Sequence, residues 1–141
     1  FEFTSFDISE AEQKCALLNL MYYGLEQNAC FDIANAESLD YEQGYFDVIL
    51  TVNMIHHLSC ASKVCDEFIR VLSSSGKIVI SDFNTHGLAI MEKVHALNGN
   101  GHEVGPDTLA DMKKMLIRRR FEVEQHCGVN LDTLIAYRGQ S

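Results

Sequence analysis

The segment "YFDVILTVNMIHHL", residues 45–58, decides the predicted fold because it joins an apolar run to a polar end. Residues 46–52 are almost all apolar, which is typical of a strand in a parallel sheet that is buried on both faces. Asn53 and two adjacent histidines, His56 and His57, follow that strand. In an open α/β sheet, ligands bind beyond the carboxyl ends of the strands. The segment therefore predicts a buried strand that leads into a binding site.

Strand and helix patterns alternate on both sides of this segment. Ser9, with Glu12 three residues later, has the pattern of a capping box and predicts the start of a helix. Strands are expected at residues 2–7, 29–33, 77–83, 121–125 and 133–137. Further helices are expected at residues 61–72, at 88–97 and from Pro106, which suits the first turn of a helix. This order predicts one α/β domain: an open, mostly parallel Rossmann-like sheet with helices on both faces and a C-terminal antiparallel hairpin.

The charge and the cysteines limit the classes of function. Eleven Lys and Arg against twenty Asp and Glu give a net charge of −9 over 141 residues. Such a charge disfavours nucleic acid and anionic membrane surfaces as partners. No stretch is long enough to cross a bilayer, so no membrane insertion is expected. The five cysteines form no CxxC pair and are expected to be reduced thiols of a cytoplasmic protein. The sequence does not indicate an oligomeric state.

Polar residues follow the predicted strands at Asp7, Asn35 and Asp82 as well as at residues 53–57. The carboxylate of Asp7 could accept two hydrogen bonds from a ribose diol, or it could stabilise the following helix N-terminus. The side chain of Asn35 and the next backbone N–H suit the edge of a purine, although Asn also favours an ordinary turn. All of these residues are expected at one edge of the sheet.

The two adjacent histidines allow several interpretations. Neighbouring residues point apart in a regular strand or helix, so His56 and His57 cannot both face one metal ion. The spacing of the other histidines matches no metal motif, and no metal site is predicted. One histidine could be packed and the other could lie at the rim of the cleft, or the pair could shape a substrate site.

Four segments together resemble a class I methyltransferase that uses S-adenosylmethionine (SAM), and most of all the branch with the ubiquinone and menaquinone C-methyltransferases. They are "SFDIS" (5–9), "NAESLDY" (35–41), "FDVILTVNMIHHL" (46–58) and "FIRVLSSSGKIVISDF" (68–83). The resemblance implies that Asp7 holds the SAM ribose and that Ile8 packs on the adenine. It also implies that the adenine contacts Asn35 and Ala36, and that the methionine part of SAM is lined by Val52 and Asn53.

The implied function is methyl transfer from SAM to a small-molecule acceptor. A general base is needed only if the acceptor must lose a proton, and His57 and His56 are the catalytic candidates. His86 and His102 are further candidates for this role.

The sequence departs from the family at its start. The family carries a glycine-rich loop after its first strand, and the first glycine here is Gly24, at a predicted helix end. Residues 1–141 are therefore expected to be a single methyltransferase-like domain without the first strand and the glycine loop, and with weak or absent SAM affinity. The alternative is a non-catalytic protein of this fold that acts as a partner-binding module. A third option is a nicotinamide-binding Rossmann domain. Such a domain also uses an acidic residue to bind a ribose, but the terminal antiparallel hairpin disfavours it.

Overall fold

A computed structural model describes residues 3–99 and 104–139 of the chain. The chain divides into two compact units, Phe1–Asp40 and Tyr41–Ser141, and each is described by itself. The strands and helices follow the order predicted from the sequence, with two additional short 3-10 helices.

The first unit contains a two-stranded parallel sheet and one helix. Strand β1 (Phe3–Asp7) pairs with β2 (Ala29–Ile33) along its whole length. The helix α1 (Glu10–Tyr23) begins where the Ser9 hydroxyl accepts the backbone N–H of Glu12, as predicted, and ends at a left-handed Gly24. The short helix η1 (Glu26–Asn28) leads into β2. Packing of α1 on both strands completes this unit.

The second unit contains a four-stranded sheet in the order β3-β4-β6-β5. Its strands are β3 (Phe46–Val52), β4 (Leu72–Phe83), β5 (Phe121–Cys127) and β6 (Leu131–Arg138). β3 runs parallel to β4, whereas β6 pairs antiparallel with both β4 and β5. The helices are α2 (Ala61–Val71), α3 (Thr85–Leu97) and α4 (Leu109–Arg118), and η2 (Ile55–His57) is a single 3-10 turn after β3.

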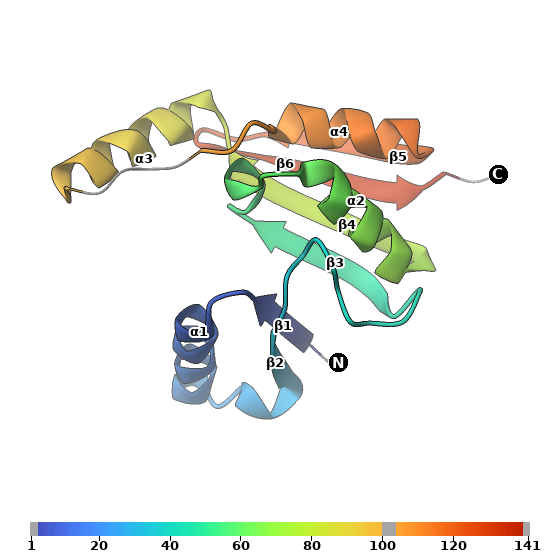
Figure 1. Cartoon of the computed structure of the whole chain (residues 1–141), viewed down its shortest axis with the longest axis horizontal. Helices are drawn as coiled ribbons and strands as arrows, with labels where there is room; N and C mark the ends of the chain where they lie inside the picture. Colours follow the sequence, from blue (N-terminus) through green and yellow to red (C-terminus); the bar gives the residue numbers. More distant parts are fainter. Residues whose placement is uncertain (1–2, 100–103, 140–141) are drawn as a thin grey trace. The chain divides into compact units, whose positions relative to one another are not determined.

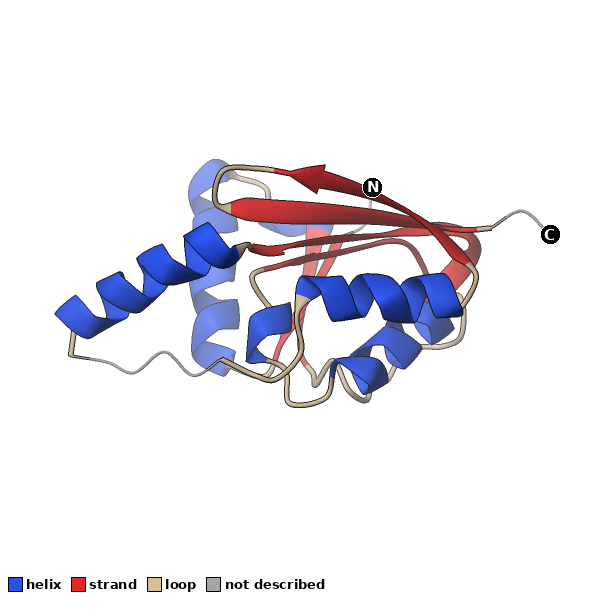
Figure 2. Cartoon of the chain, turned by 90° about the horizontal axis from the view of Figure 1, so that it is seen from above, coloured by secondary structure: helices blue, strands red, loops and turns tan. Residues whose placement is uncertain are grey.

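Helices α2 and α4 lie on the same side of the four-stranded sheet, as Figures 1 and 2 show. Apolar side chains of the helices and the strands form the core between them, namely Val64, Phe68, Met112, Leu116, Ile49, Ile78, Ile80, Leu134 and Ala136. Burial of this set is the main driving force for the fold of the unit. Helix α3 leaves the end of β4 and extends beyond the sheet (Figure 1).

The other face of β3 is open, which corrects the prediction of a strand buried on both faces. Ile49 is buried, whereas Val48, Leu50 and Val52 on the opposite face are 50%, 62% and 54% exposed. On its outer side β3 pairs with no strand that the structure describes. The sequence shows that these residues are apolar, but burial also needs a covering element.

The predicted single, mostly parallel sheet is also corrected. The described strands form two sheets, and their four ladders are divided equally between parallel and antiparallel pairing. Antiparallel pairs arise because β6 of the C-terminal hairpin pairs with β4. Two sheets arise because β1 and β3 form no hydrogen-bonded pair. In the second unit α2 and α4 lie on one face of the four-stranded sheet, and helices on both faces stay a prediction.

Two helices begin at other residues than predicted because their caps lie elsewhere. Asn84 caps α3 by accepting the backbone N–H groups of His86 and Gly87, so the helix starts at Thr85. Thr108 and Asp111 form a capping box, so α4 starts at Leu109 and Pro106 lies outside its first turn. None of the helices described is both long enough and apolar enough to cross a membrane.

Candidate functional site

Asn53 lies directly after β3 in an unusual conformation. Its φ angle of 54° is left-handed, which is rare for a residue other than glycine. Its backbone N–H donates to the carbonyl of Ser81 on β4 at 2.9 Å. Its side-chain Oδ1 is buried and takes no hydrogen bond from the described residues. An unsatisfied buried acceptor on a left-handed residue calls for a partner, which a ligand or an ordered water would supply.

A buried carboxylate holds the next turn. Asp82, which is 2% exposed, accepts the backbone N–H of His56 at 3.0 Å and meets the ring Nδ1 of His56 at 2.5 Å. Asp82 also accepts the backbone N–H of Phe83 at 2.7 Å. Because a carboxylate only accepts hydrogen bonds, Nδ1 of His56 carries the proton. The sequence placed Asp82 at a strand end, but its link to His56 came only from the structure.

The two histidines therefore have different surroundings. His56 is 5% exposed and lies against the ring of Phe83, with 5.4 Å between the ring centroids. His57 is exposed, and its ring centroid lies 4.0 Å from that of His56. This is the arrangement of one packed and one accessible histidine that the sequence left open. The side chain of His57 is therefore open to solvent, whereas that of His56 is not.

In the first unit, Asp7 and Ile8 follow the carboxyl end of β1. One oxygen of Asp7, Oδ1, accepts the backbone N–H of Ser9 at 2.8 Å. The side chain is exposed, and its Oδ2 takes no hydrogen bond from the described residues. Ile8 is 74% exposed.

Asn35 lies in a tight turn after β2. Its Oδ1 accepts the backbone N–H of Glu37, and its carbonyl accepts that of Ser38, both at 2.9 Å. Ala36 is buried within this turn, so only its backbone could contact a ligand. The structure thus gathers Asp7, Ile8 and Asn35 at the carboxyl edge of the first unit. It gathers Val52, Asn53, His56 and His57 at the carboxyl edge of the second.

The further histidine candidates lie elsewhere or cannot be placed. The ring of His86 on α3 forms a hydrogen bond of 2.8 Å with Asn130 in the turn between β5 and β6. His102 lies outside the described residues. In the described ranges no group of His, Cys, Asp and Glu side chains gathers as metal ligands would.

The first turn of α3 is anchored to the β5–β6 turn. Asn84 donates from Nδ2 to the carbonyls of Gly128 and Val129 and to the carboxylate of Asp132, whose pKa this bond lowers. The backbone N–H of Asn84 donates to the carbonyl of Asn130. Because α3 extends beyond the sheet, these bonds set the direction in which it leaves the carboxyl edge.

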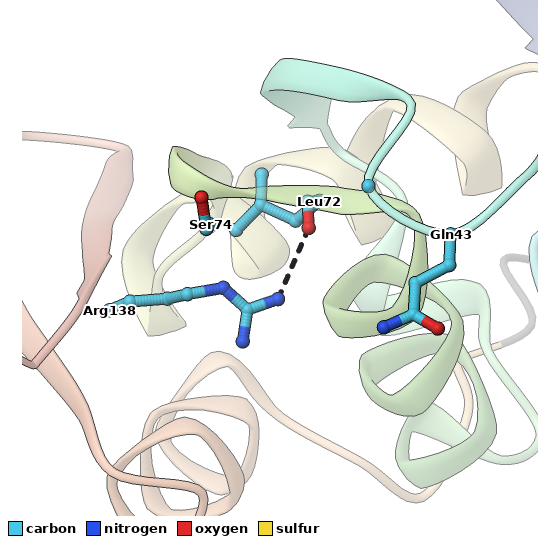
Figure 3. Close-up of a pocket in the computed structure, with 5 residues that line it drawn as sticks. Gln43, Leu72, Ser74 and Arg138 are labelled. Atoms are coloured by element: carbon cyan, nitrogen blue, oxygen red, sulfur yellow. Dashed lines mark hydrogen bonds between the residues drawn. The ribbon is translucent and has the colours of Figure 1, made fainter.

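A cavity of about 530 Å³ lies at the other end of the second unit, where β3 and β4 begin. Figure 3 shows the residues that line it. Gln43, Gly44, Leu72, Ser74 and Arg138 line it. The guanidinium of Arg138 donates to the carbonyls of Ile69, Leu72 and Ser73 at the end of α2. Arg138 therefore caps α2, as cations do at helix C-termini, and the cavity has no group poised for chemistry.

The fold is that of an α/β protein with polar residues at the carboxyl ends of its strands. The chain belongs to the methyltransferase domain family, whose model matches residues 1–127. This match confirms the predicted resemblance to the class I SAM-dependent methyltransferases.

Curated relatives share part of the sequence. The chain is 35% identical over 82 residues to norajmaline N-methyltransferase of Rauvolfia serpentina, a match that covers 58% of this chain and 28% of that enzyme. It is 27% identical over 89 residues to the ubiquinone/menaquinone biosynthesis C-methyltransferase UbiE of Shewanella frigidimarina, covering 63% of this chain and 36% of UbiE. The matched region thus spans well under half the length of these relatives.

Solved structures share the fold over nearly the whole chain. The PH0226 protein of Pyrococcus horikoshii has a TM-score of 0.79 at 18% identity, covering 98% of this chain and 74% of that one. A SAM-dependent methyltransferase of Aquifex aeolicus has a TM-score of 0.72 at 16% identity, with coverages of 97% and 69%. The [4+2]-cyclase SpnF has a TM-score of 0.74 at 12% identity, with coverages of 100% and 68%.

Proposed function

We propose that the protein is a SAM-dependent methyltransferase that acts on a small-molecule acceptor. The observation that carries the proposal is Asn53, which is strained and has a buried, unsatisfied Oδ1 directly after β3. The family match supplies the class of reaction. The named N- and C-methyltransferase relatives support a small molecule as the acceptor, and the net charge of −9 disfavours a nucleic acid.

The proposed cofactor contacts agree with the chemistry of the residues. The second oxygen of Asp7 can accept from a ribose hydroxyl, and exposed Ile8 can pack on the adenine ring. The turn at Asn35 and Ala36 offers backbone groups to the edge of a purine. Val52 and Asn53 would line the methionine part, where the Oδ1 of Asn53 accepts a hydrogen bond from a bound N–H group.

Bound SAM would supply an electrophilic methyl group for an in-line displacement. The residues of this chain would then hold the acceptor in line and exclude water, which is the main source of rate in such a reaction. His57 is exposed next to the strand end and is the candidate base for acceptors that lose a proton. His56 would act through packing, because its ring is bound to Asp82.

We further propose that the active form pairs another strand with the outer edge of β3. The two outer strands of the four-stranded sheet differ: β5 carries Glu122 and Glu124, whereas β3 carries only Asp47 and exposes three apolar side chains. Charged residues protect an edge from pairing, and an apolar, uncharged edge invites it. A parallel strand with a glycine-rich loop, as in the family, would satisfy this edge and complete the cofactor site.

Variants of Asn53 separate the strain from the side-chain contact. Glycine adopts a left-handed φ without cost, so Asn53→Gly should hold or raise the free energy of unfolding, by up to about 1 kcal/mol. The same variant loses Oδ1, so its affinity for S-adenosylhomocysteine should fall about tenfold. Calorimetric titration and urea unfolding of a chain extended upstream measure the two quantities.

Asn53→Asp is the matched control, because it keeps an oxygen at the same place and a residue that tolerates the left-handed conformation. It should bind more tightly than Asn53→Gly. Equal affinity of wild type and Asn53→Gly would show that the side chain of Asn53 contacts no cofactor, and would remove the main support for the proposal.

The second candidate is a non-catalytic protein of this fold that binds a partner. The exposed apolar face of β3 favours it, since such a face is typical of an interaction surface. The likeness to a [4+2]-cyclase agrees with a fold that is not restricted to one activity. Absence of S-adenosylhomocysteine binding by a folded, extended chain would favour this candidate.

A further inference from the structure

The turn at residues 53–57 is held from two sides. On one side, the carboxylate of Asp82 binds the backbone N–H and the ring of His56. On the other side, the backbone N–H of Gly105 donates to the carbonyl of His56 at 2.7 Å. The backbone N–H, the carbonyl and the ring of His56 thus all form hydrogen bonds. These bonds fix the position of His56 within the turn.

The left-handed conformation of Asn53 needs a neighbouring residue whose position is fixed. A left-handed Asn53 with a buried, unsatisfied Oδ1 is less stable than a relaxed turn. Strain of this kind persists only where the surrounding structure determines the backbone more than once. The bond from Asn53 N–H to Ser81 fixes the start of the turn, and Asp82, the next residue along β4, fixes its end.

We infer that Asp82 is a positioning residue: its carboxylate holds Asn53 in the left-handed conformation and holds His56 as the Nδ1–H tautomer. The consequence for cofactor affinity rests on the proposed function, whereas the effect on the turn does not. Asp82 would contact neither the cofactor nor the methyl acceptor. It would act through His56 and the turn. Both of its oxygens are needed, because Oδ2 accepts the N–H of His56 while Oδ1 accepts the N–H of Phe83 and the ring Nδ1–H.

An amide cannot replace this carboxylate. In Asp82→Asn one oxygen becomes an NH2 group, which then faces either the backbone N–H of His56 or that of Phe83. Two donors in contact repel, so the turn must move or the histidine ring must change its tautomer. Asp132→Asn is the matched control, because Asp132 lies opposite Asp82 in the β4–β6 ladder and binds Asn84 and Gln125 instead of His56.

Two measurements, on residues 1–141 and on a chain extended upstream, test the inference. Spectra of ¹⁵N-histidine-labelled protein report the tautomer of His56, whose signal is identified by its loss in His56→Gln. Wild type and Asp132→Asn should show a single Nδ1–H tautomer, and Asp82→Asn should lose it, with amide shifts concentrated at residues 53–57. Affinity of the extended chain for S-adenosylhomocysteine should fall about tenfold or more in Asp82→Asn and less than about twofold in Asp132→Asn.

Each outcome decides a different claim. An Nε2–H tautomer of His56 in the wild type would overturn the role of Asp82, and this result does not depend on any variant of Asp82. Unchanged turn signals in Asp82→Asn would also overturn it. If the wild-type extended chain binds no S-adenosylhomocysteine while the tautomer and turn signals behave as expected, the proposed function fails but the positioning role of Asp82 stands.

Discussion

Leu50→Lys is expected to leave the stability of residues 1–141 almost unchanged but to destabilise a chain that is extended upstream. In residues 1–141, Leu50 is 62% exposed, so a lysine should change the free energy of unfolding by no more than about 0.5 kcal/mol. In a chain extended upstream, the proposed strand would pair with β3 and its connecting elements would cover Leu50. Burial of an ammonium group in place of a leucine would then cost about 4 kcal/mol. Urea unfolding of both chains measures the difference.

Val129→Lys is the control for this pair of measurements. Val129 lies in the turn between β5 and β6 and is 80% exposed, away from the edge of β3. It should be neutral in both chains. Equal, small effects of Leu50→Lys in the two chains would show that nothing covers this face, and the proposal of a further strand at β3 would then be withdrawn.

Gly87→Ala should destabilise the second unit by about 3 kcal/mol. A Cβ atom at this position would come within 2.1 Å of the carbonyl oxygen of Asn130 and within 2.8 Å of the ring of Phe83. A backbone oxygen cannot move aside as a side chain can. The first turn of α3 must therefore separate from the β5–β6 turn, or the helix must tilt, and the hydrogen bonds of Asn84 are lost in either case.

Thermal unfolding measures the loss, and hydrogen exchange of the α3 amides shows where it occurs. Ala89→Ser is the control on the same helix, because Ala89 is exposed and the substitution adds a single atom. It should cost less than about 0.7 kcal/mol. If Gly87→Ala matched this control, the close approach to Asn130 would not fix the position of α3.

Periodicity and capping patterns predicted the elements well because both are local. Ser9 and Glu12 gave the start of α1, and the apolar run at residues 46–52 gave β3 within its bounds. Asn84 is a cap of the same chemistry, but the apolar pattern that predicted α3 begins only at Leu88, so the start of α3 was misplaced. For α4, the preference of Pro106 for a first turn placed the start ahead of the true cap, Thr108. The prediction that β3 is buried on both faces was wrong, because burial depends on other elements that the strand's own sequence does not describe.

The site could be predicted at the level of its residues but not of its geometry. Polar residues after apolar runs identified Asn53 and the histidines, since carboxyl ends of parallel strands share an edge. Contacts between β3 and β4 determine the geometry of the site. They give Asn53 its left-handed φ and its buried oxygen, and they bring the carboxylate of Asp82 to the backbone N–H of His56. Gly105 reaches the same turn from 49 residues further along the chain, a contact that no local pattern indicates.

Titration of S-adenosylhomocysteine into the extended chain, with Asp7→Asn and Asp7→Ala beside it, tests the central claim most directly. Micromolar binding is expected in the wild type, with a loss of about tenfold or more in Asp7→Ala and a smaller loss in Asp7→Asn, which keeps one acceptor oxygen. Residues 1–141 alone should bind more weakly. No binding by the folded, extended wild type, or equal binding by all three proteins, would contradict the account.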